Sequence, residues 1–252
     1  MPILGLASKD HPDPLKLIGS GTFVTINSQH YVLTAAHVWQ ATELFPTIGL
    51  SLTSYESWFQ IPRDGISAHT LRGVRFGELG PDLALLEISS ALVPRIMAHK
   101  SVLDLSQQRQ AFLTDPLALD LGIWAVTGMS EAISEVRARP EQRKFEADVQ
   151  GRAFFSGIAG TLEVDGYDYL DVGADMALAD VPPSFGGVSG AGLWQIRLSL
   201  SKQTGQVSWT GQKRLTGVAY WQSEMRNGRR VIRCHGPRTL FERAWAQWGL
   251  PG

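Results

Sequence analysis

A serine surrounded by glycines is the first feature of this chain that could carry chemistry. The segment PSFGGVSGAGLW runs from Pro183 to Trp194 and places four glycines around Ser189. Glycine allows positive φ and the close approach of other groups, so the segment is typical either of a turn or of a backbone shaped to present one side chain. A serine hydroxyl is a weak nucleophile unless a neighbouring base takes its proton. The rest of the chain must therefore supply a base.

One histidine and one aspartate have the right contexts. Among six histidines, only His37 closely follows an apolar strand-like run, YVLTAA, and we expect its imidazole at the end of that strand. Asp82 precedes the apolar run LALLEI. Histidine suits the role of base because its ordinary pKa lies near neutrality, and a buried carboxylate fixes the imidazole tautomer. Each residue alone also has a structural interpretation, as a packed histidine, a turn aspartate or a turn serine.

The order of the three candidates is informative. His37, Asp82 and Ser189 follow the order of chymotrypsin-type hydrolases, whereas α/β-hydrolases and subtilisins place the same residue types in two other orders. The hydrolase motif G-x-S-x-G is also incomplete, because Ala191 occupies its fifth position. The order therefore favours the chymotrypsin type.

The surrounding sequence predicts an all-β protein. Short runs rich in Val, Ile, Thr, Tyr and Trp recur between turn residues, which is typical of strands in a sandwich or barrel. These runs are GTFVTI (21–26), HYVLTAA (30–36), LALLEI (83–88), GIWAVTG (122–128), AGLWQIRL (191–198), VSWTG (207–211), LTGVAYW (215–221) and RRVIRC (229–234). Asn227-Gly228 between the last two predicts a hairpin turn.

Three other segments complete the organisation. TLFERAWAQWG predicts a C-terminal helix that begins with a capping box formed by Thr239 and Glu242 and packs its aromatic face. The charged stretch 130–148 predicts a solvated loop or an exposed helix around Pro140. The stretch 104–122 predicts a linker between two β halves.

Composition excludes several classes of function. The 252 residues carry a formal net charge of −1, which gives no electrostatic support for binding nucleic acid or an anionic membrane. The single cysteine, Cys234, excludes an internal disulfide framework and fits a reducing compartment. Without a basic N-terminal signal or an apolar stretch of about 20 residues, we expect a cytoplasmic protein.

Taken together, these segments resemble the chymotrypsin-like (trypsin-fold) serine proteases. SGTFVTINSQHYVLTAAHV is similar to the paired strands that lead to that family's catalytic histidine, PDLALLEI to its aspartate and following strand, and GGVSGAGLW to its nucleophile loop. LTGVAYWQS resembles the strand that lines its substrate cleft, and the terminal helix also matches. The resemblance runs from about residue 18 to 249, with 130–180 and 195–214 poorly matched.

The resemblance implies two six-stranded Greek-key β-barrels packed face to face, with a C-terminal α-helix and the active site between the barrels. The first barrel, residues 1–115, would carry His37 and Asp82, and the second, residues 116–252, would carry Ser189. It also implies that the backbone N–H groups of Gly187 and Ser189 form the oxyanion hole, where two donors must converge on the tetrahedral oxyanion.

The nucleophile loop departs from the family pattern. The family has an aspartate directly before the serine, which in secreted members receives a new N-terminal amine after activation cleavage; here the position is Val188. Valine cannot accept that salt bridge, so we expect a preformed site or one ordered by a partner protein. Ala191 and Gly192 replace the usual glycine and proline, which resembles divergent intracellular bacterial-type members.

The expected substrate cleft is lined by Pro183, Tyr220, Trp221 and Gln222, of which the last three would pair as a strand with the substrate backbone. The position that reads a basic side chain in trypsin falls on Pro183, so no preference for Arg or Lys is supported. Gln222 stands where the family often has glycine and is expected to narrow the pocket. We expect a small or apolar residue before the scissile bond, unless Glu224, otherwise an exposed glutamate, reaches in.

The sequence therefore predicts a serine endopeptidase that acts on a protein or peptide substrate through His37, Asp82 and Ser189. The alternative is a protease fold that has lost catalysis and serves as a binding or regulatory module. No cofactor is expected: Cys234 and His235 have no second ligand pair at metal-binding spacing, and no glycine-rich phosphate loop opens a helix. Because Val188 cannot accept the activating salt bridge, we also expect an activating or regulatory protein partner.

Overall fold

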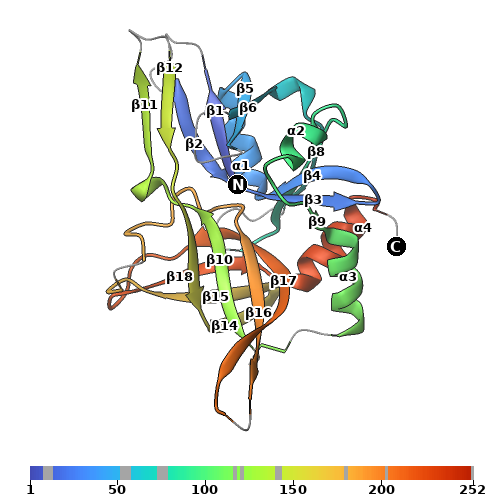
Figure 1. Cartoon of the computed structure of the whole chain (residues 1–252), viewed down its shortest axis with the longest axis vertical. Coiled ribbons are helices and arrows are strands. Elements are labelled where there is room, and N and C mark those ends of the chain that lie inside the picture. The colour runs from blue at the N-terminus through green and yellow to red at the C-terminus, as the bar shows by residue number, and fades with distance from the viewer. Residues whose placement is uncertain are drawn as a thin grey trace.

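The computed structural model describes residues 1–7, 14–51, 58–72, 79–115, 118–119, 122–139, 144–178, 181–201 and 204–250. Most of these residues lie in strands, and helices are few and short (Figure 1). The predicted all-β class is therefore confirmed. In the described ranges no helix is long and apolar enough to cross a bilayer.

Two sheets form the first part of the chain. An antiparallel sheet has the order β2-β1-β5-β6, with β1 Pro2–Leu6, β2 Leu15–Ser20, β5 Thr47–Ser51 and β6 Trp58–Pro62. A second sheet has the order β7-β8-β4-β3-β9, with β3 Thr22–Ile26, β4 Gln29–Thr34, β7 Ala68–Arg72, β8 Asp82–Ile88 and β9 Leu103–Asp104. Its pairings are antiparallel except that of β9 with β3.

Two further sheets form the second part. A seven-stranded antiparallel sheet has the order β13-β10-β16-β17-β18-β15-β14. Its strands are β10 Ile123–Met129, β13 Gly151–Ser156, β14 Ile158–Val164, β15 Tyr167–Asp175, β16 Gly192–Leu200, β17 Val207–Gln222 and β18 Arg229–His235. A two-stranded sheet joins β11 Glu135–Arg139 to β12 Lys144–Asp148. No described sheet closes into a barrel, and no described strand pairing crosses residue 115.

The short helices lie between these strands. They are α1 Ala36–Ala41, α2 Val93–Met97, α3 Leu105–Thr114 and α4 Trp245–Gln247, with 3-10 turns η1 Thr42–Leu44, η2 Arg63–Gly65 and η3 Glu131–Ile133 and a π-helical segment η5 Thr239–Ala244. Two sequence predictions need correction here. The stretch 104–122 contains helix α3 rather than only a linker, and the charged stretch 130–148 contains β11 and β12 rather than an exposed helix; Pro140 lies outside the described residues.

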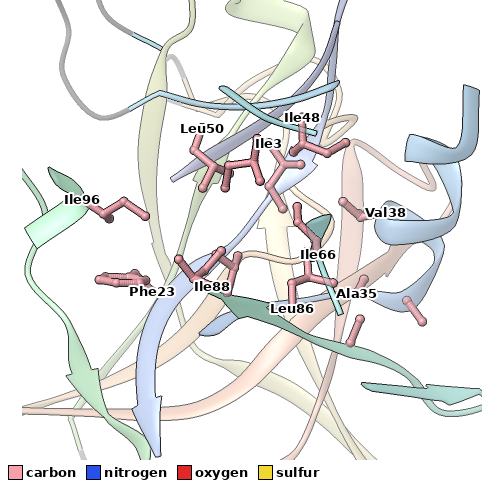
Figure 2. Packing of buried hydrophobic residues seen from close by; sticks show 14 of the residues in the cluster. Ile3, Phe23, Ala35, Val38, Ile48, Leu50, Ile66, Leu86, Ile88 and Ile96 are labelled. Atoms are coloured by element: carbon pink, nitrogen blue, oxygen red, sulfur yellow. The ribbon is translucent and has the colours of Figure 1, made fainter. Parts of the chain in front are cut away.

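The core of the first part lies between its two sheets. Figure 2 shows Ile3 and Leu50 from the β2-β1-β5-β6 sheet facing Phe23 and Ile88 from the other. All four are at most 5% exposed. Burial of a side chain of this size contributes about 1.5–3 kcal/mol, so the apolar faces of the two sheets hold this half together.

The C-terminal helical segment packs against the first half of the chain. Phe241, Trp245 and Trp248 are buried in one apolar cluster with Val24 and Leu33, which confirms the predicted packing of the aromatic face. The predicted capping box is wrong. The Thr239 hydroxyl instead accepts a hydrogen bond from the Asp168 N–H and donates one to the Asp168 carbonyl oxygen. Strand β15 lies against this end of the helix, so its backbone takes the place of Glu242 as the partner of Thr239.

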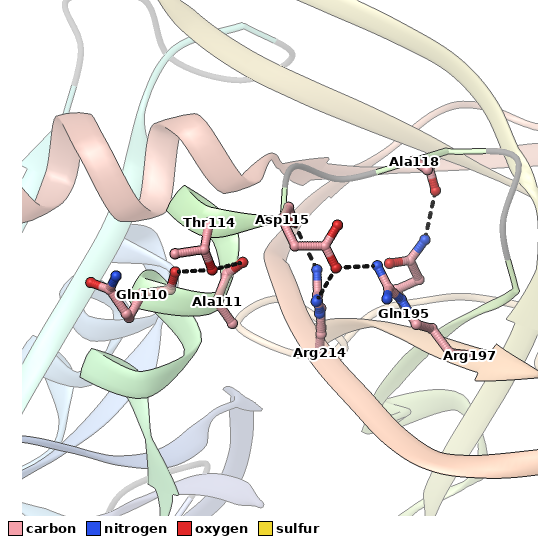
Figure 3. Close-up of polar contacts among 8 residues, drawn as sticks. All are labelled: Gln110, Ala111, Thr114, Asp115, Ala118, Gln195, Arg197 and Arg214. Carbon is pink, nitrogen blue, oxygen red and sulfur yellow. Dashed lines mark hydrogen bonds and ion pairs between the residues drawn. The ribbon is translucent and has the colours of Figure 1, made fainter.

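Helix α3 joins the two halves. The Asp104 carboxylate accepts a hydrogen bond from Gln107 N at its N-terminus (3.0 Å), which explains why a helix starts inside a stretch predicted as a linker. Figure 3 shows the other end, where the Asp115 carboxylate is paired with Arg197 of β16 (2.8 Å) and Arg214 of β17 (2.6 Å). The connection is thereby fixed to the seven-stranded sheet.

Turn chemistry follows the sequence closely at one hairpin. Asn227 and Gly228 connect β17 to β18 with φ of 50° and 73°. Positive φ at both central residues is the geometry of a type I′ turn, which suits the twist of an antiparallel pair. The predicted hairpin is confirmed. It reverses the chain so that β18 pairs antiparallel with β17.

Candidate active site

His37 and Asp82 form a close pair in the first half of the chain. The His37 Nδ1 atom lies 2.5 Å from Asp82 Oδ2, and the His37 backbone N–H donates to Asp82 Oδ1 at 2.8 Å. Asp82 is the first residue of β8, as the sequence predicts. His37 is not at a strand end, because β4 stops at Thr34 and His37 is the second residue of helix α1. The helical start directs both its backbone N–H and its ring toward Asp82.

The pair has defined electrostatics. Burial acts to raise the pKa of Asp82, but the hydrogen bonds and the charge of His37 outweigh burial and hold that pKa below its ordinary value. Asp82 is therefore ionised near neutrality and accepts a hydrogen from Nδ1. With Nδ1 carrying the hydrogen, Nε2 of His37 has a free lone pair and can act as a base. The His37 side chain is 38% exposed, so a substrate can reach it.

A buried histidine from the second half supports Asp82 from behind. The Asp82 backbone N–H donates to His235 Nε2 at 3.1 Å. His235 is fully buried, and burial lowers its pKa to about 3, so the ring is neutral and Nε2 is an acceptor. The Tyr220 ring stacks on it with centroids 4.1 Å apart. From the sequence alone, His235 stands out only as the neighbour of Cys234 in a possible pair of metal ligands.

The glycine-rich loop around Ser189, residues 185–191, leaves two backbone donors unused. The N–H groups of Phe185, Gly186, Val188 and Gly190 each donate to a neighbouring oxygen. In the described part of the chain, the N–H groups of Gly187 and Ser189 donate to none. Gly187 has a φ of 83°, a conformation that favours glycine. Buried or half-buried backbone donors are nearly always paired, so this pair of unused donors is a ready site for an anionic oxygen.

Ser20 connects this loop to the first half. Its backbone N–H donates to the Ser189 carbonyl oxygen (2.8 Å), and its hydroxyl donates to the Gly187 carbonyl oxygen (2.8 Å). The same hydroxyl accepts from Met129 N (2.8 Å), and the Ser20 carbonyl oxygen accepts from the Thr34 hydroxyl (2.7 Å). Ser20 is fully buried. By binding these two carbonyl groups, Ser20 fixes the Gly187–Val188 and Ser189–Gly190 peptide planes, each of which directly follows a residue with an unused donor.

The His37 and Ser189 segments meet at Gly19. A Cβ built on Gly19 would lie 2.7 Å from the Val38 side chain and 2.9 Å from the Ser189 carbonyl oxygen, so only glycine fits between the residue after His37 and the nucleophile loop. No hydrogen bond joins the Ser189 hydroxyl to His37 among the described residues. Such contacts are often long before substrate binds.

Val188 packs where the family pattern has an aspartate. Its side chain is 7% exposed and belongs to an apolar cluster with Phe185, Ala191 and Leu193. A carboxylate in this cluster would be costly without a buried positive partner. Val188 therefore contributes apolar packing, and the hydrogen bonds from Ser20 hold the loop in place.

A pocket of about 220 Å³ lies beside Ser189. Three of the four residues expected at the substrate cleft, Tyr220, Trp221 and Gln222, line it. The fourth, Pro183, is exposed and is not part of its wall. Gln222 Oε1 accepts hydrogen bonds from Phe185 N (3.1 Å) and Arg230 Nη1 (2.9 Å). These two hydrogen bonds hold the Gln222 side chain between Phe185 and Arg230 in the pocket wall.

The remaining lining is apolar. Phe185, Val188, Ala219 and Ile232 contribute to the wall, and no acidic residue is found among the described residues that line it. Glu224 is exposed and lies outside this pocket. The pocket can therefore take a small or apolar side chain, and it offers no partner for the charge of a bound Lys or Arg.

Two residues of this site were not identified from the sequence. Ser20 stands in IGSGT, where a serine between glycines has the appearance of a strand end, and His235 ends a strand whose last four residues are all buried. Neither has a local signal, because its partners lie more than 100 residues away in the chain. No protein-family model matches the chain, and no curated protein matches its sequence.

Proposed function

We propose that this protein is a serine endopeptidase with a divergent chymotrypsin-like fold. The observation that carries the proposal is the combination of the His37–Asp82 pair with a glycine-rich loop in which, across the described residues 185–191, only the N–H groups of Gly187 and Ser189 have no acceptor. Chemistry of this type needs a base with a fixed tautomer and two convergent donors for an oxyanion. The two six-stranded Greek-key barrels are part of this proposal, with a boundary near residue 115.

The mechanism follows from the roles of these groups. The Ser189 Oγ attacks the peptide carbonyl carbon while His37 Nε2 takes the hydroxyl proton, and the C=O π electrons move onto the carbonyl oxygen. The N–H groups of Gly187 and Ser189 stabilise that oxyanion. His37 then gives its proton to the leaving amine as the C–N bond breaks, and a water molecule hydrolyses the acyl-enzyme by the same steps. Asp82 stays ionised and stabilises the imidazolium.

Activation by a new N-terminal amine would need a carboxylate directly before Ser189 to accept the amine, and that position is Val188. Other hydrogen bonds supply the order instead. Ser20 bonds the Gly187 and Ser189 carbonyl groups, and the Gly186 and Val188 carbonyl groups, which share peptide planes with the two donors, accept from Glu131 N and Ala191 N, so the loop is ordered without cleavage. We infer that Ser20 is a positioning residue for the oxyanion hole. The apolar lining beside Ser189 supports a small or apolar residue before the scissile bond.

One observation favours a different function. The absence of a hydrogen bond between Ser189 and His37, among the described residues, is what a protease fold without catalysis would also have. Such a protein would bind a peptide or a partner protein at the same surface without cleaving it. The two functions differ in whether Ser189 is reactive.

A serine-directed fluorophosphonate probe separates them. We expect the wild-type protein to be labelled covalently at Ser189, the Ser189→Ala variant to be unlabelled, and Ser67→Ala, at an exposed serine, to be labelled like the wild type. Peptide mapping of the adduct identifies the modified residue. Absence of labelling in a folded wild-type protein would contradict the proposal and favour the binding module.

A further inference from the structure

A second and larger pocket, of about 580 Å³, opens next to the pocket at Ser189 and shares Trp221 with it. It is formed by the end of β17, the following turn and β18. Its charged lining residues are Arg226, Arg229, Arg230, Arg233, Asp171 and Glu224. We call it the arginine pocket.

One ion pair in the arginine pocket is already complete. The Arg233 guanidinium binds the Asp171 carboxylate through two nitrogens, at 2.7 and 2.9 Å. It also lies over the Trp221 ring, 5.2 Å from the centroid. Paired guanidinium and carboxylate groups neutralise each other, so this pair stiffens the wall shared by the two pockets and contributes no net charge.

The other arginines have no carboxylate partner. In the part of the chain that the structure describes, the Arg226 and Arg229 side chains make no hydrogen bond or ion pair, and both are exposed. Arg230 donates Nη1 to Gln222 Oε1, but its Nε is buried and has no acceptor. Of the two carboxylates that line the arginine pocket, Asp171 is paired with Arg233, so Glu224 is the one that is in no described ion pair. A buried N–H without an acceptor is unfavourable, and an anionic group in the pocket would satisfy it.

The edge of β17 leads from Ser189 to this pocket. Strand β16 pairs with β17 as far as Gly192 opposite Val218, and Ala219 bonds to residues 190 and 191. Beyond that point, Trp221 and Gln222 pair with β18 on one side, and no described strand pairs with their other side. An extended peptide can add itself to such an edge as a further strand.

The spacing along this edge fixes which substrate residue reaches the arginine pocket. Tyr220 lines the pocket at Ser189, whereas Ser223 and Glu224 line only the arginine pocket. A strand advances about 3.3 Å per residue and β17 ends at Gln222, so these positions are separated by at most about 10–13 Å. A bound strand has the same repeat. A peptide whose reacting carbonyl lies at Ser189 therefore places a side chain about three or four residues away over the arginines.

The chemistry indicates the direction of the peptide. His37, which protonates the leaving amine in the proposed mechanism, belongs to the first half of the chain. Every residue that lines the two pockets lies between 171 and 233, in the second half. The leaving part of the substrate must approach His37, so the acyl part, N-terminal to the scissile bond, lies along β17 toward the arginine pocket.

We propose that the arginine pocket binds an aspartate or glutamate side chain of the substrate, three or four residues N-terminal to the residue that carries the scissile carbonyl. Arginine fits this role because its planar guanidinium offers several donors to one carboxylate. This specificity rests on the proposed function, since it takes Ser189 as the point of attack. The substrate class is then a peptide with acidic residues followed, after a short spacer, by a small or apolar residue at the cut.

Binding can be measured without cleavage in the Ser189→Ala variant. We would compare the peptide acetyl-Glu-Glu-Ala-Ala-Val-Ala-Gly, with a fluorophore at its C-terminal end, with its Gln-Gln counterpart by fluorescence anisotropy. The acidic peptide is expected to bind about tenfold more tightly, with a preference that shrinks as ionic strength rises. Wild-type kcat/KM for the two unlabelled peptides, measured by mass spectrometry, should differ in the same direction.

Variants assign the preference to the arginine pocket. Arg226→Gln/Arg229→Gln should abolish it, whereas Lys16→Gln/Arg152→Gln, which removes two exposed positive charges elsewhere, should retain it. Glu224→Gln should strengthen binding of the acidic peptide. Equal binding of the two peptides, or a preference that survives in the Arg226/Arg229 variant, would overturn the proposal.

The outcome is separable from that of the proposed function. If Ser189 is labelled by the fluorophosphonate probe but the two peptides are bound and cleaved equally, the endopeptidase stands and the acidic specificity fails. If the probe does not label Ser189 but the acidic peptide binds through Arg226 and Arg229, catalysis fails and the arginine pocket stands as a peptide-binding site.

Discussion

Replacement of the buried His235 by glutamine tests the support of Asp82 through its effect on stability. The pKa of His235 is lowered by burial from the ordinary 6.5 to about 3. Above the ordinary pKa the ring is neutral in both the folded and the unfolded chain, so it adds no pH dependence. As the pH falls below that value, the unfolded chain takes up a proton and the folded chain does not. Stability is therefore lost toward acid.

The magnitude follows from the size of the shift. Each pH unit between the two pKa values costs about 1.4 kcal/mol, so His235 lowers the free energy of unfolding by about 2 kcal/mol between about pH 7 and about pH 5. The loss would reach about 5 kcal/mol near pH 3, where the folded ring begins to protonate. The neighbouring Asp82 charge acts to raise the pKa of His235 and the His37 charge acts to lower it, but burial is the largest effect.

The assay is urea denaturation followed by tryptophan fluorescence at the two pH values, for wild type, His235→Gln and His99→Gln. Glutamine is neutral throughout and retains an oxygen that can accept from Asp82 N, so His235→Gln should lose about 2 kcal/mol less than wild type between these pH values. His99→Gln, at an exposed histidine, should follow the wild type. Parallel losses in wild type and His235→Gln would refute a neutral buried ring.

Three other substitutions test the site. Ser20→Ala removes the hydroxyl bonded to the Gly187 carbonyl oxygen and Met129 N. We expect kcat for peptide cleavage to fall with little change in KM, but by less than the roughly 10²–10³-fold cost of losing an oxyanion donor itself, because Ser20 acts through the loop. An unchanged kcat would exclude a positioning role. Gly190 has a φ of 86°, and a Cβ there would overlap the Ser20 carbonyl oxygen, so Gly190→Ala should lower the free energy of unfolding by about 3 kcal/mol or more. The control Gly65→Ala, whose Cβ would meet nothing within 4 Å, should leave it unchanged. Equal urea midpoints for the two variants would contradict the tight fit at Gly190. Asp82→Asn should slow fluorophosphonate labelling about 10³–10⁴-fold by favouring the wrong His37 tautomer, and retention of the wild-type labelling rate would argue against the proposed mechanism.

Local patterns in the sequence predicted much of the secondary structure. The runs around 22–26 and 83–88 are strands, and Asn227-Gly228 forms the expected turn. These predictions succeed because alternation of apolar residues and turn chemistry act over a few residues. Helix α3 was missed because its composition is largely polar, and its start depends on Asp104 serving as an N-cap within a stretch that reads as a linker.

The C-terminal helix illustrates the same limit. Its aromatic spacing correctly predicted the buried face, since that spacing is a property of the segment itself. The predicted capping box failed because Thr239 has a stronger set of partners in Asp168, which lies about 70 residues earlier in the chain. A competing partner from another strand cannot be seen in local sequence.

The sequence by itself determined the residue types and order of His37, Asp82 and Ser189, the glycines around the serine, and the apolar Val188 directly before it. Tertiary structure alone decided that Ser20 holds the carbonyl groups beside Val188, that His235 accepts from Asp82 N, and that arginines gather beside the β17 edge. The physical reason is range: a motif encodes backbone shape over a few residues, whereas the partners of a buried polar group depend on which distant strands the packed sheets bring together.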